Sequence, residues 1–143
     1  MSRGKKAYLQ YESQLSKAIG RLSQLREELK SAIDADAASY NSVMKAYKSA
    51  KESSDGDAAI GAALKQATSI PLGVAERAVE VTKIATKLKP ITNPNMKSDL
   101  TTAIALAKAA LEGALANVDI NLDSLKDEGF VSETRKKAAA LKV

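Results

Sequence analysis

Asp36 is the residue whose type and position most strongly suggest chemistry, because it stands within an apolar pattern. Asp36 falls on a stripe of apolar side chains, whereas Asp34, about 200° away around the same helix, falls on its polar side. We therefore expect Asp36 to be buried or half-buried, and a buried carboxyl needs a partner or a role. The stripe recurs at helical steps of three and four and comprises Tyr8, Tyr11, Leu15, Leu22, Leu25, Leu29, Ile33, Tyr40, Val43 and Tyr47.

A carboxyl held in an apolar setting can act as a general acid or base. Two structural alternatives remain open for Asp36 on spacing alone. The side chain can lie at the edge of the stripe, or where the helix leaves the core. A lysine from another part of the chain can also neutralise it.

Two amides form a second candidate site, since Asn117 and Asn121 interrupt a segment rich in alanine and glycine. Four residues apart on a helix, they share a face with Ala110 and Gly113, and Asp99 opens the same helix at nearly the same azimuth. In this position they can hydrogen-bond a planar, amide-like heterocycle. The structural alternative is that they satisfy each other or a neighbouring helix, because a buried Asn needs partners for its donors and its acceptor.

The sequence predicts that the elements positioning these residues are all helices. Pro71, Pro90 and Pro94 mark the places where a helix is expected to be interrupted. A loop is expected at 53–57 and a turn at 90–95, and Pro71 is expected to break or kink its helix. Ser132 is the expected N-cap of the last helix. The fold class is all-α, an antiparallel helical bundle with long helices in one domain, 1–143. The expected helices are 5–50, 58–70, 72–89, 96–125 and 132–141.

Composition narrows the chemistry, because the 143 residues include no Cys and no His. Thiol nucleophiles, disulfides, imidazole bases and the usual zinc sites are therefore excluded, and no metal-binding residue is expected. The net charge of +5 is spread among acids without an aromatic or glycine motif beside it, which favours a solvated surface over nucleic-acid binding. No apolar run suits a membrane span and no signal peptide is visible, so we expect a cytoplasmic protein.

Five segments, taken in order, resemble the cyclodeaminase/cyclohydrolase family. This family includes the C-terminal domain of formiminotransferase-cyclodeaminase and stand-alone methenyltetrahydrofolate cyclohydrolases. No single motif is specific, but five in the right order cover most of the chain. The segments are Gly4-Lys5-Lys6-Ala7-Tyr8, Ile33-Asp34-Ala35-Asp36-Ala37-Ala38-Ser39-Tyr40, Ala67-Thr68-Ser69-Ile70-Pro71-Leu72, Asn93-Pro94-Asn95-Met96-Lys97-Ser98-Asp99 and Asn117-Val118-Asp119-Ile120-Asn121-Leu122.

The resemblance implies an all-helical homodimer that acts on one-carbon tetrahydrofolates. The tetrahydrofolate derivative is then the substrate, and no separate cofactor is expected. Cyclodeaminases close 5-formiminotetrahydrofolate to 5,10-methenyltetrahydrofolate and release ammonia, and cyclohydrolases interconvert the methenyl and 10-formyl forms. The family's proposed catalytic Asp corresponds to Asp36, which would shuttle a proton from N10 to the departing nitrogen. Lys5 and Lys6 are expected to meet the anionic glutamate tail. The other expected substrate-binding residues are Tyr40, Ser98, Asp99, Asn117 and Asn121.

One departure from the family pattern concerns the start of the sequence. Met1 stands inside the stretch where the family's Gly-rich turn and first helix should end. We therefore expect the domain to lack that segment. The alternative to an enzyme is a truncated, non-catalytic helical protein that binds folate or serves in oligomerisation. The sequence does not distinguish deamination from hydrolysis.

Overall fold

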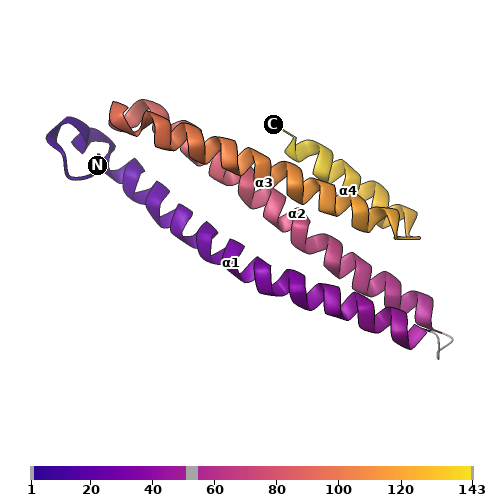
Figure 1. Ribbon diagram of the computed structural model, residues 1–143. Coiled ribbons are helices and arrows are strands. Elements are labelled where there is room, and N and C mark those ends of the chain that lie inside the picture. The colour runs from indigo at the N-terminus through magenta and orange to yellow at the C-terminus, as the bar shows by residue number, and fades with distance from the viewer. Residues whose placement is uncertain (1, 51–54, 143) are drawn as a thin grey trace.

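The structure, a computed structural model, describes residues 2–50 and 55–142 and is helical almost throughout (Figure 1). No strand occurs within these two ranges. The predicted fold class, an all-α bundle with long helices, is confirmed. The elements in chain order are a 3-10 helix at Lys6–Tyr11, α1 (Glu12–Ser49), α2 (Gly56–Leu88), two 3-10 turns at Lys89–Ile91 and Pro94–Met96, α3 (Lys97–Asp123) and α4 (Glu128–Leu141).

α2 is the central helix, because α1 and α3 both pack along it. Each of them runs antiparallel to α2, so α1 and α3 run parallel to each other (Figure 1). α4 is shorter and folds back beside α2 and α3. No helix in the described ranges combines the length and apolar character needed to cross a bilayer.

The core is built from small side chains where α2, α3 and α4 meet. Alanines supply much of it, so the helices approach one another closely rather than being spaced by large rings. Leu72, Val74 and Leu141 pack against this core from its edge. Its buried members are Ala75, Ala78, Val79, Leu111, Ala114, Leu115 and Ala138.

α1 is attached to α2 by polar contacts as much as by burial. Of its 38 residues, Leu15, Leu25 and Ser39 are the buried ones. Arg21 on α1 donates hydrogen bonds of 2.6 and 2.7 Å to the carboxylate of Glu80 on α2. A second inter-helix pair, from Arg77 on α2 to Glu28 on α1, measures 2.7 Å.

These pairs form one network, because Arg21 also contacts Glu28 at 2.9 Å. Hydrogen bonds from Arg21 and then Arg77 hold the pKa of Glu28 below its ordinary value. A hydrogen bond from Arg21 likewise lowers the pKa of Glu80. The network therefore favours charged carboxylates in the folded state.

Of the two outcomes expected at Pro71, a break or a kink, the break is wrong, and so are the separate helices expected at 58–70 and 72–89. α2 is one continuous helix through Pro71. A proline interrupts a helix through its missing N–H and its ring, but neither effect stops a helix whose neighbours hold it on both sides. The last helix also begins earlier than predicted, at Glu128, with Asp127 rather than Ser132 as its N-cap.

The Asp127 cap is direct, since its Oδ1 accepts a 3.0 Å hydrogen bond from Phe130 N. The loop expected at 53–57 is only partly covered by the structure. Residues 53 and 54 lie outside the described ranges, whereas Gly56 and Asp57 already belong to α2.

Candidate functional site

A groove of about 390 Å³ lies between α1 and α3, and residues of α2 also line it. Asp36 from α1 and Asn117 from α3 are its polar side chains. Segments far apart in the sequence are thus brought to one site by packing on a common helix. The remaining lining residues are apolar or small: Leu29, Ala32, Ile33, Ile70, Pro71, Val74, Ala110, Gly113 and Ala114.

The small residues of α3 create the space for this groove. An added Cβ at Gly113 would meet no heavy atom within 4 Å. Ala110, Gly113 and Asn117 occupy the same face of α3, as their spacing predicts. The open wall opposite Asp36 is therefore a direct consequence of residue size at these positions.

The prediction that Asp36 is buried or half-buried is wrong for this chain, because its side chain is exposed. The apolar stripe of α1 packs in its first half, where Leu25 is fully buried, but turns to solvent further on, where Ile33 is 69% exposed. The stripe drifts around the helix axis, and α1 has α2 alone along most of its inner side. Ser39 takes the buried position instead, and Asp36 lies beside it at the edge of the packed face.

This position corresponds to the structural alternative of an acid at the edge of the stripe. The edge is nevertheless the mouth of the groove, so an exposed Asp36 can still face a bound molecule. The Asp36 backbone carbonyl accepts a 2.8 Å hydrogen bond from Ser39 Oγ, which ties the two residues within one turn. Asp34 is also exposed but does not line the groove.

Asn121 lies one turn beyond Asn117 but makes a different contact. Its Nδ2 donates a 3.2 Å hydrogen bond to the backbone carbonyl of Ala67 on α2. The side chain is half-buried and does not line the groove. The alternative in which the amide satisfies a neighbouring helix thus describes Asn121.

The remaining predicted site residues lie elsewhere. Ser98 and Asp99 are exposed at the start of α3, and Asp99 lies about 27 Å along the helix from Asn117 at 1.5 Å per residue. Lys5 and Lys6 are exposed at the same end of the molecule, where Ser2 Oγ accepts a 2.8 Å hydrogen bond from Asn93 N. Tyr40 is exposed on α1, one turn beyond Asp36.

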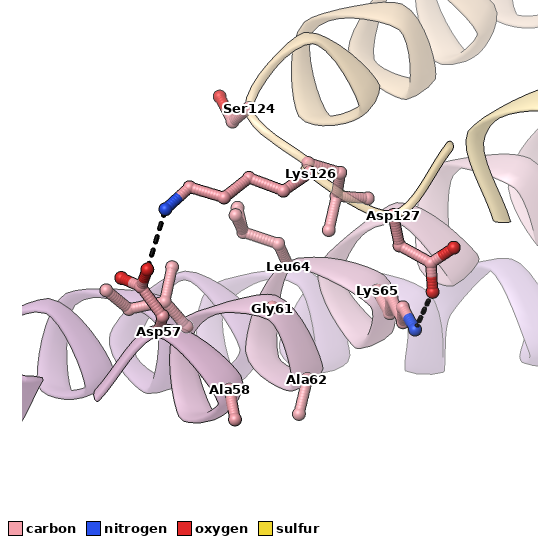
Figure 2. Close-up of a pocket in the computed structure, with 11 residues that line it drawn as sticks. Asp57, Ala58, Gly61, Ala62, Leu64, Lys65, Ser124, Lys126 and Asp127 are labelled. Carbon is pink, nitrogen blue, oxygen red and sulfur yellow. Dashed lines mark hydrogen bonds and ion pairs between the residues drawn. The ribbon is translucent and has the colours of Figure 1, made fainter. Parts of the chain in front are cut away.

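A second cavity of about 390 Å³ lies between the first turns of α2 and the α3–α4 turn (Figure 2). Lys126 Nζ contacts Asp57 Oδ2 at 2.7 Å, and Lys65 contacts Asp127. Each contact lowers the pKa of its aspartate through a lysine hydrogen bond. These four charged groups pair with one another, so this cavity is explained by attachment of the α3–α4 turn to α2.

The groove residues contributed by α2 could not be found from the sequence as site residues. Ile70, Pro71 and Val74 carry no functional groups, and their role is to wall the groove. The one available signal was on α3, where small residues repeat in register with Asn117. That signal indicates an open helix face but does not identify what lies opposite.

Comparison with known proteins agrees with the resemblance in the sequence. A family model described as formiminotransferase-cyclodeaminase matches residues 1–140. A methenyltetrahydrofolate cyclohydrolase from Methylorubrum extorquens is 33% identical over 142 residues, and a formimidoyltransferase-cyclodeaminase from Gallus gallus is 33% identical over 148 residues. The crystal structure of a formiminotetrahydrofolate cyclodeaminase from Thermotoga maritima matches with a TM-score of 0.91 at 28% identity.

The matches span nearly all of this chain but different shares of the relatives. They cover 96% of this chain and 68% of the Methylorubrum protein, and 99% of this chain and 68% of the Thermotoga chain. The chain spans 27% of the Gallus protein, with 99% of its own length matched. Sequence and fold therefore agree, and the chain belongs to the formiminotransferase-cyclodeaminase family.

Proposed function

We propose that this protein converts a one-carbon tetrahydrofolate in the groove between α1 and α3, with Asp36 as general acid and base. The reaction is closure of 5-formiminotetrahydrofolate to 5,10-methenyltetrahydrofolate with loss of ammonia, or hydrolysis of the methenyl form. The relatives named for these two activities support both versions. The tetrahydrofolate derivative is the substrate, and the reaction takes no separate cofactor.

The observation that carries this proposal is the meeting of Asp36 and Asn117 in one groove. The groove joins a titratable carboxyl, a group with both hydrogen-bond donors and an acceptor, and apolar walls. A planar, polar-edged ring suits such a site, because its faces meet apolar walls and its edge meets the amide. We therefore assign the Asn117 amide to hydrogen bonding with the pterin ring of the substrate.

In either reaction, one carboxyl, that of Asp36, is sufficient for the proton transfer. In the deaminase reaction N10 attacks the formimino carbon, the N10–H proton is lost, and the amino group is protonated and departs as ammonia. Asp36 accepts the first proton and returns it to the leaving nitrogen. In the hydrolase reaction the same carboxylate removes a proton from the water that attacks the methenyl carbon. General acid–base help of this kind contributes about 10²–10⁴ in rate.

We further propose that the working form is a homodimer in which a second copy covers the groove. Apolar side chains flank Asp36 on the open face of α1, among them Ile33 at 69% and Tyr40 at 63% exposure. Contiguous exposed apolar groups of this kind are typical of an association surface. Covering this face would exclude water from Asp36, a setting that one chain alone does not provide.

The remaining predicted residues fit this arrangement as contributions from the second copy. Lys5, Lys6, Ser98 and Asp99 lie at one end of the folded helical bundle, away from the groove of the same copy. In a dimer, that end of one copy can approach the groove of the other and place the lysines near the anionic glutamate tail. A cytoplasmic location suits this role and a chain without cysteine. Neither nucleic acid nor a membrane is a partner in this proposal.

Two turnover assays test the function and separate its versions. Ammonia release from 5-formiminotetrahydrofolate reports deamination, and loss of absorbance from 5,10-methenyltetrahydrofolate reports hydrolysis. We expect one of the two substrates to be turned over. Failure of both, with intact helical structure, would contradict the enzymatic proposal.

The alternative of a non-catalytic folate-binding protein is favoured by one observation, the exposure of Asp36. Calorimetric titration with tetrahydrofolates, run beside the turnover assays, separates the two functions. Binding without turnover of either substrate would support the non-catalytic protein. Turnover that requires Asp36 would exclude it.

A further inference from the structure

The uninterrupted course of α2 through Pro71 raises a hydrogen-bonding question. α-Helical geometry directs the N–H of residue 71 at the carbonyl of residue 67, and proline has no N–H. Ala67 is only 7% exposed and Pro71 is also buried. A carbonyl left without a partner at such a position destabilises the folded state.

Asn121 supplies the missing donor from another helix. Its Nδ2 lies 3.2 Å from the carbonyl oxygen of Ala67, which is the acceptor that Pro71 leaves without its helical partner. A side-chain amide can do this because it carries two N–H donors. Aspartate would place an acceptor against an acceptor, and leucine would offer no donor.

The contact lies directly beside the groove. Ile70 and Pro71 line the groove from α2, and Asn117, one turn before Asn121, lines it from α3. The Asn121–Ala67 hydrogen bond therefore joins α3 to the turn of α2 that walls the site. The relative placement of Asn117 and the Pro71 turn depends on this connection.

We infer that Asn121 is a positioning residue that replaces the N–H missing at Pro71 and thereby fixes α3 against the groove wall of α2. It acts through Ala67 rather than by touching the substrate. The expected effect of Asn121 variants on turnover rests on the proposed function, whereas their expected effect on folding stability does not. The role differs from the direct substrate contact expected for Asn121 from the sequence.

A double-mutant cycle tests this inference, because Pro71→Ala restores the missing donor within α2. Asn121→Leu, in the native background, is expected to lower the folding equilibrium constant about tenfold in urea titrations. In the Pro71→Ala background the same change is expected to cost about threefold or less, since the N–H of residue 71 then bonds Ala67. Equal losses in the two backgrounds would overturn the inference.

Two further variants make the cycle specific. Asn121→Ala repeats the test with a smaller side chain, so that overpacking by leucine does not decide the result. Asn117→Leu makes the same chemical change one turn earlier on α3, where the side chain faces the groove. Its effect on stability is expected to be the same with Pro71 or with alanine at position 71, and a dependence on position 71 equal to that of Asn121 would count against the inference.

Turnover supplies the readout that distinguishes positioning from substrate contact. Asn121→Leu is expected to lower kcat/KM about tenfold in the native background, and about threefold or less when both proteins compared carry Pro71→Ala. Equal losses of kcat/KM in both backgrounds would assign Asn121 to direct substrate contact and overturn the positioning role. If the wild-type protein turns over neither folate, the proposed function fails, and the stability cycle alone still decides the inference.

Discussion

At the scale of single residues, the site depends on a carboxyl at the edge of a packed helix face and on small residues opposite it. Asp36 has an accessible side chain because α1 is packed from one side, and Gly113 leaves space across the groove. Because Asp36 is accessible, its ability to carry a proton depends on what covers the groove. Because Gly113 has no side chain, a larger residue at this position tests whether the space in the groove is needed.

Gly113→Ala is expected to stabilise the protein by about 0.5–1 kcal/mol, because glycine inside a helix costs backbone entropy. An added Cβ meets nothing within 4 Å. Thermal unfolding should show Tm higher by about 2–4 °C for a chain of this size. Gly20→Ala on α1, equally free of contacts, is the matched control and should give a similar gain. A loss of stability in Gly113→Ala alone would show that α3 is closer to its neighbours than the structure has it.

A larger side chain at position 113 is expected to act on function instead. Gly113→Leu places an isobutyl group into the groove that holds Asp36 and Asn117, so KM for the folate should rise or turnover should be lost. Gly20→Leu adds the same group away from the groove and should leave turnover near the wild-type level. Unchanged kinetics in Gly113→Leu would place the substrate elsewhere.

Residue-level prediction from the sequence was partial for a physical reason. The pairing of Asn117 with small residues on one face of α3 could be predicted, because helical spacing fixes which residues share a face. The exposure of Asp36 could not, because periodicity shows which side chains are apolar but not how far the neighbouring helix covers them. Asn121 could not be assigned either, since its partner is a backbone carbonyl that only folding brings near.

At the scale of helices, α1 is the element whose attachment depends most on charge. Its buried residues are few, and Arg21 and Glu28 connect it to Glu80 and Arg77 on α2. Partly exposed ion pairs are individually weak, but a bidentate arginine in a network fixes the register of one helix against another. Because α1 carries Asp36, the register that this network fixes also determines where the Asp36 carboxyl lies along the groove.

The network predicts a dependence of stability on pH. The folded-state pKa of Glu28 and of Glu80 lies below the ordinary value of 4.5, mainly because Arg21 donates hydrogen bonds to both. Their contribution is therefore present above about pH 4.5 and is lost as the pH falls through the lowered pKa values. Glu28→Gln should lower the urea midpoint near neutral pH, and its difference from wild type should shrink on acidification.

Glu27→Gln is the matched control for this measurement. Glu27 neighbours Glu28 but pairs with Arg26 and Lys30 on the exposed side of α1 rather than with α2. Its removal should change the urea midpoint little at any pH. An equal, pH-independent loss in both variants would show that the inter-helix network does not attach α1.

Helix positions were largely predictable, and the exceptions have identifiable causes. Both bounds of α3 and the end of α1 were expected within two residues, because their apolar periodicity and flanking turns are clear. The first helix was expected from residue 5, whereas Lys6–Tyr11 is a 3-10 helix and α1 begins at Glu12. The expected break at Pro71 was wrong because a helix can pass through proline when a neighbour satisfies the freed carbonyl, and Asn121 does so. Asp127 was not predicted as the N-cap of α4 because Gly129, a residue with low helix propensity, lies in the first turn of this helix.

At the scale of the whole molecule, the open face of α1 is the feature that one chain leaves unexplained. Ile33, Tyr40, Met44 and Tyr47 are exposed along it by 41–69%. The groove opens beside this face, so association there would both bury apolar surface and cover Asp36. Assembly and catalysis are therefore expected to depend on the same surface.

Tyr47→Lys is expected to weaken self-association, because it places a charge on the apolar face without altering a groove residue. Sedimentation velocity over a range of protein concentrations should show a lower fraction of dimer than wild type. Ala140→Lys adds the same charge at an exposed position on α4, away from this face, and serves as the control. A wild-type protein that stays monomeric throughout would contradict the dimer proposal.

The measurement that tests the central claim most directly is turnover of the active folate by Asp36→Asn beside Asp34→Asn. The two changes are chemically identical and lie two residues apart on α1, but only Asp36 lines the groove. Asp36→Asn is expected to lower kcat by about 10²–10⁴ with the helical fold intact, since it removes the proton carrier. Asp34→Asn is expected to retain activity near that of wild type. Full activity in Asp36→Asn, or an equal loss in both variants, would contradict the assignment of Asp36 as the catalytic acid and base.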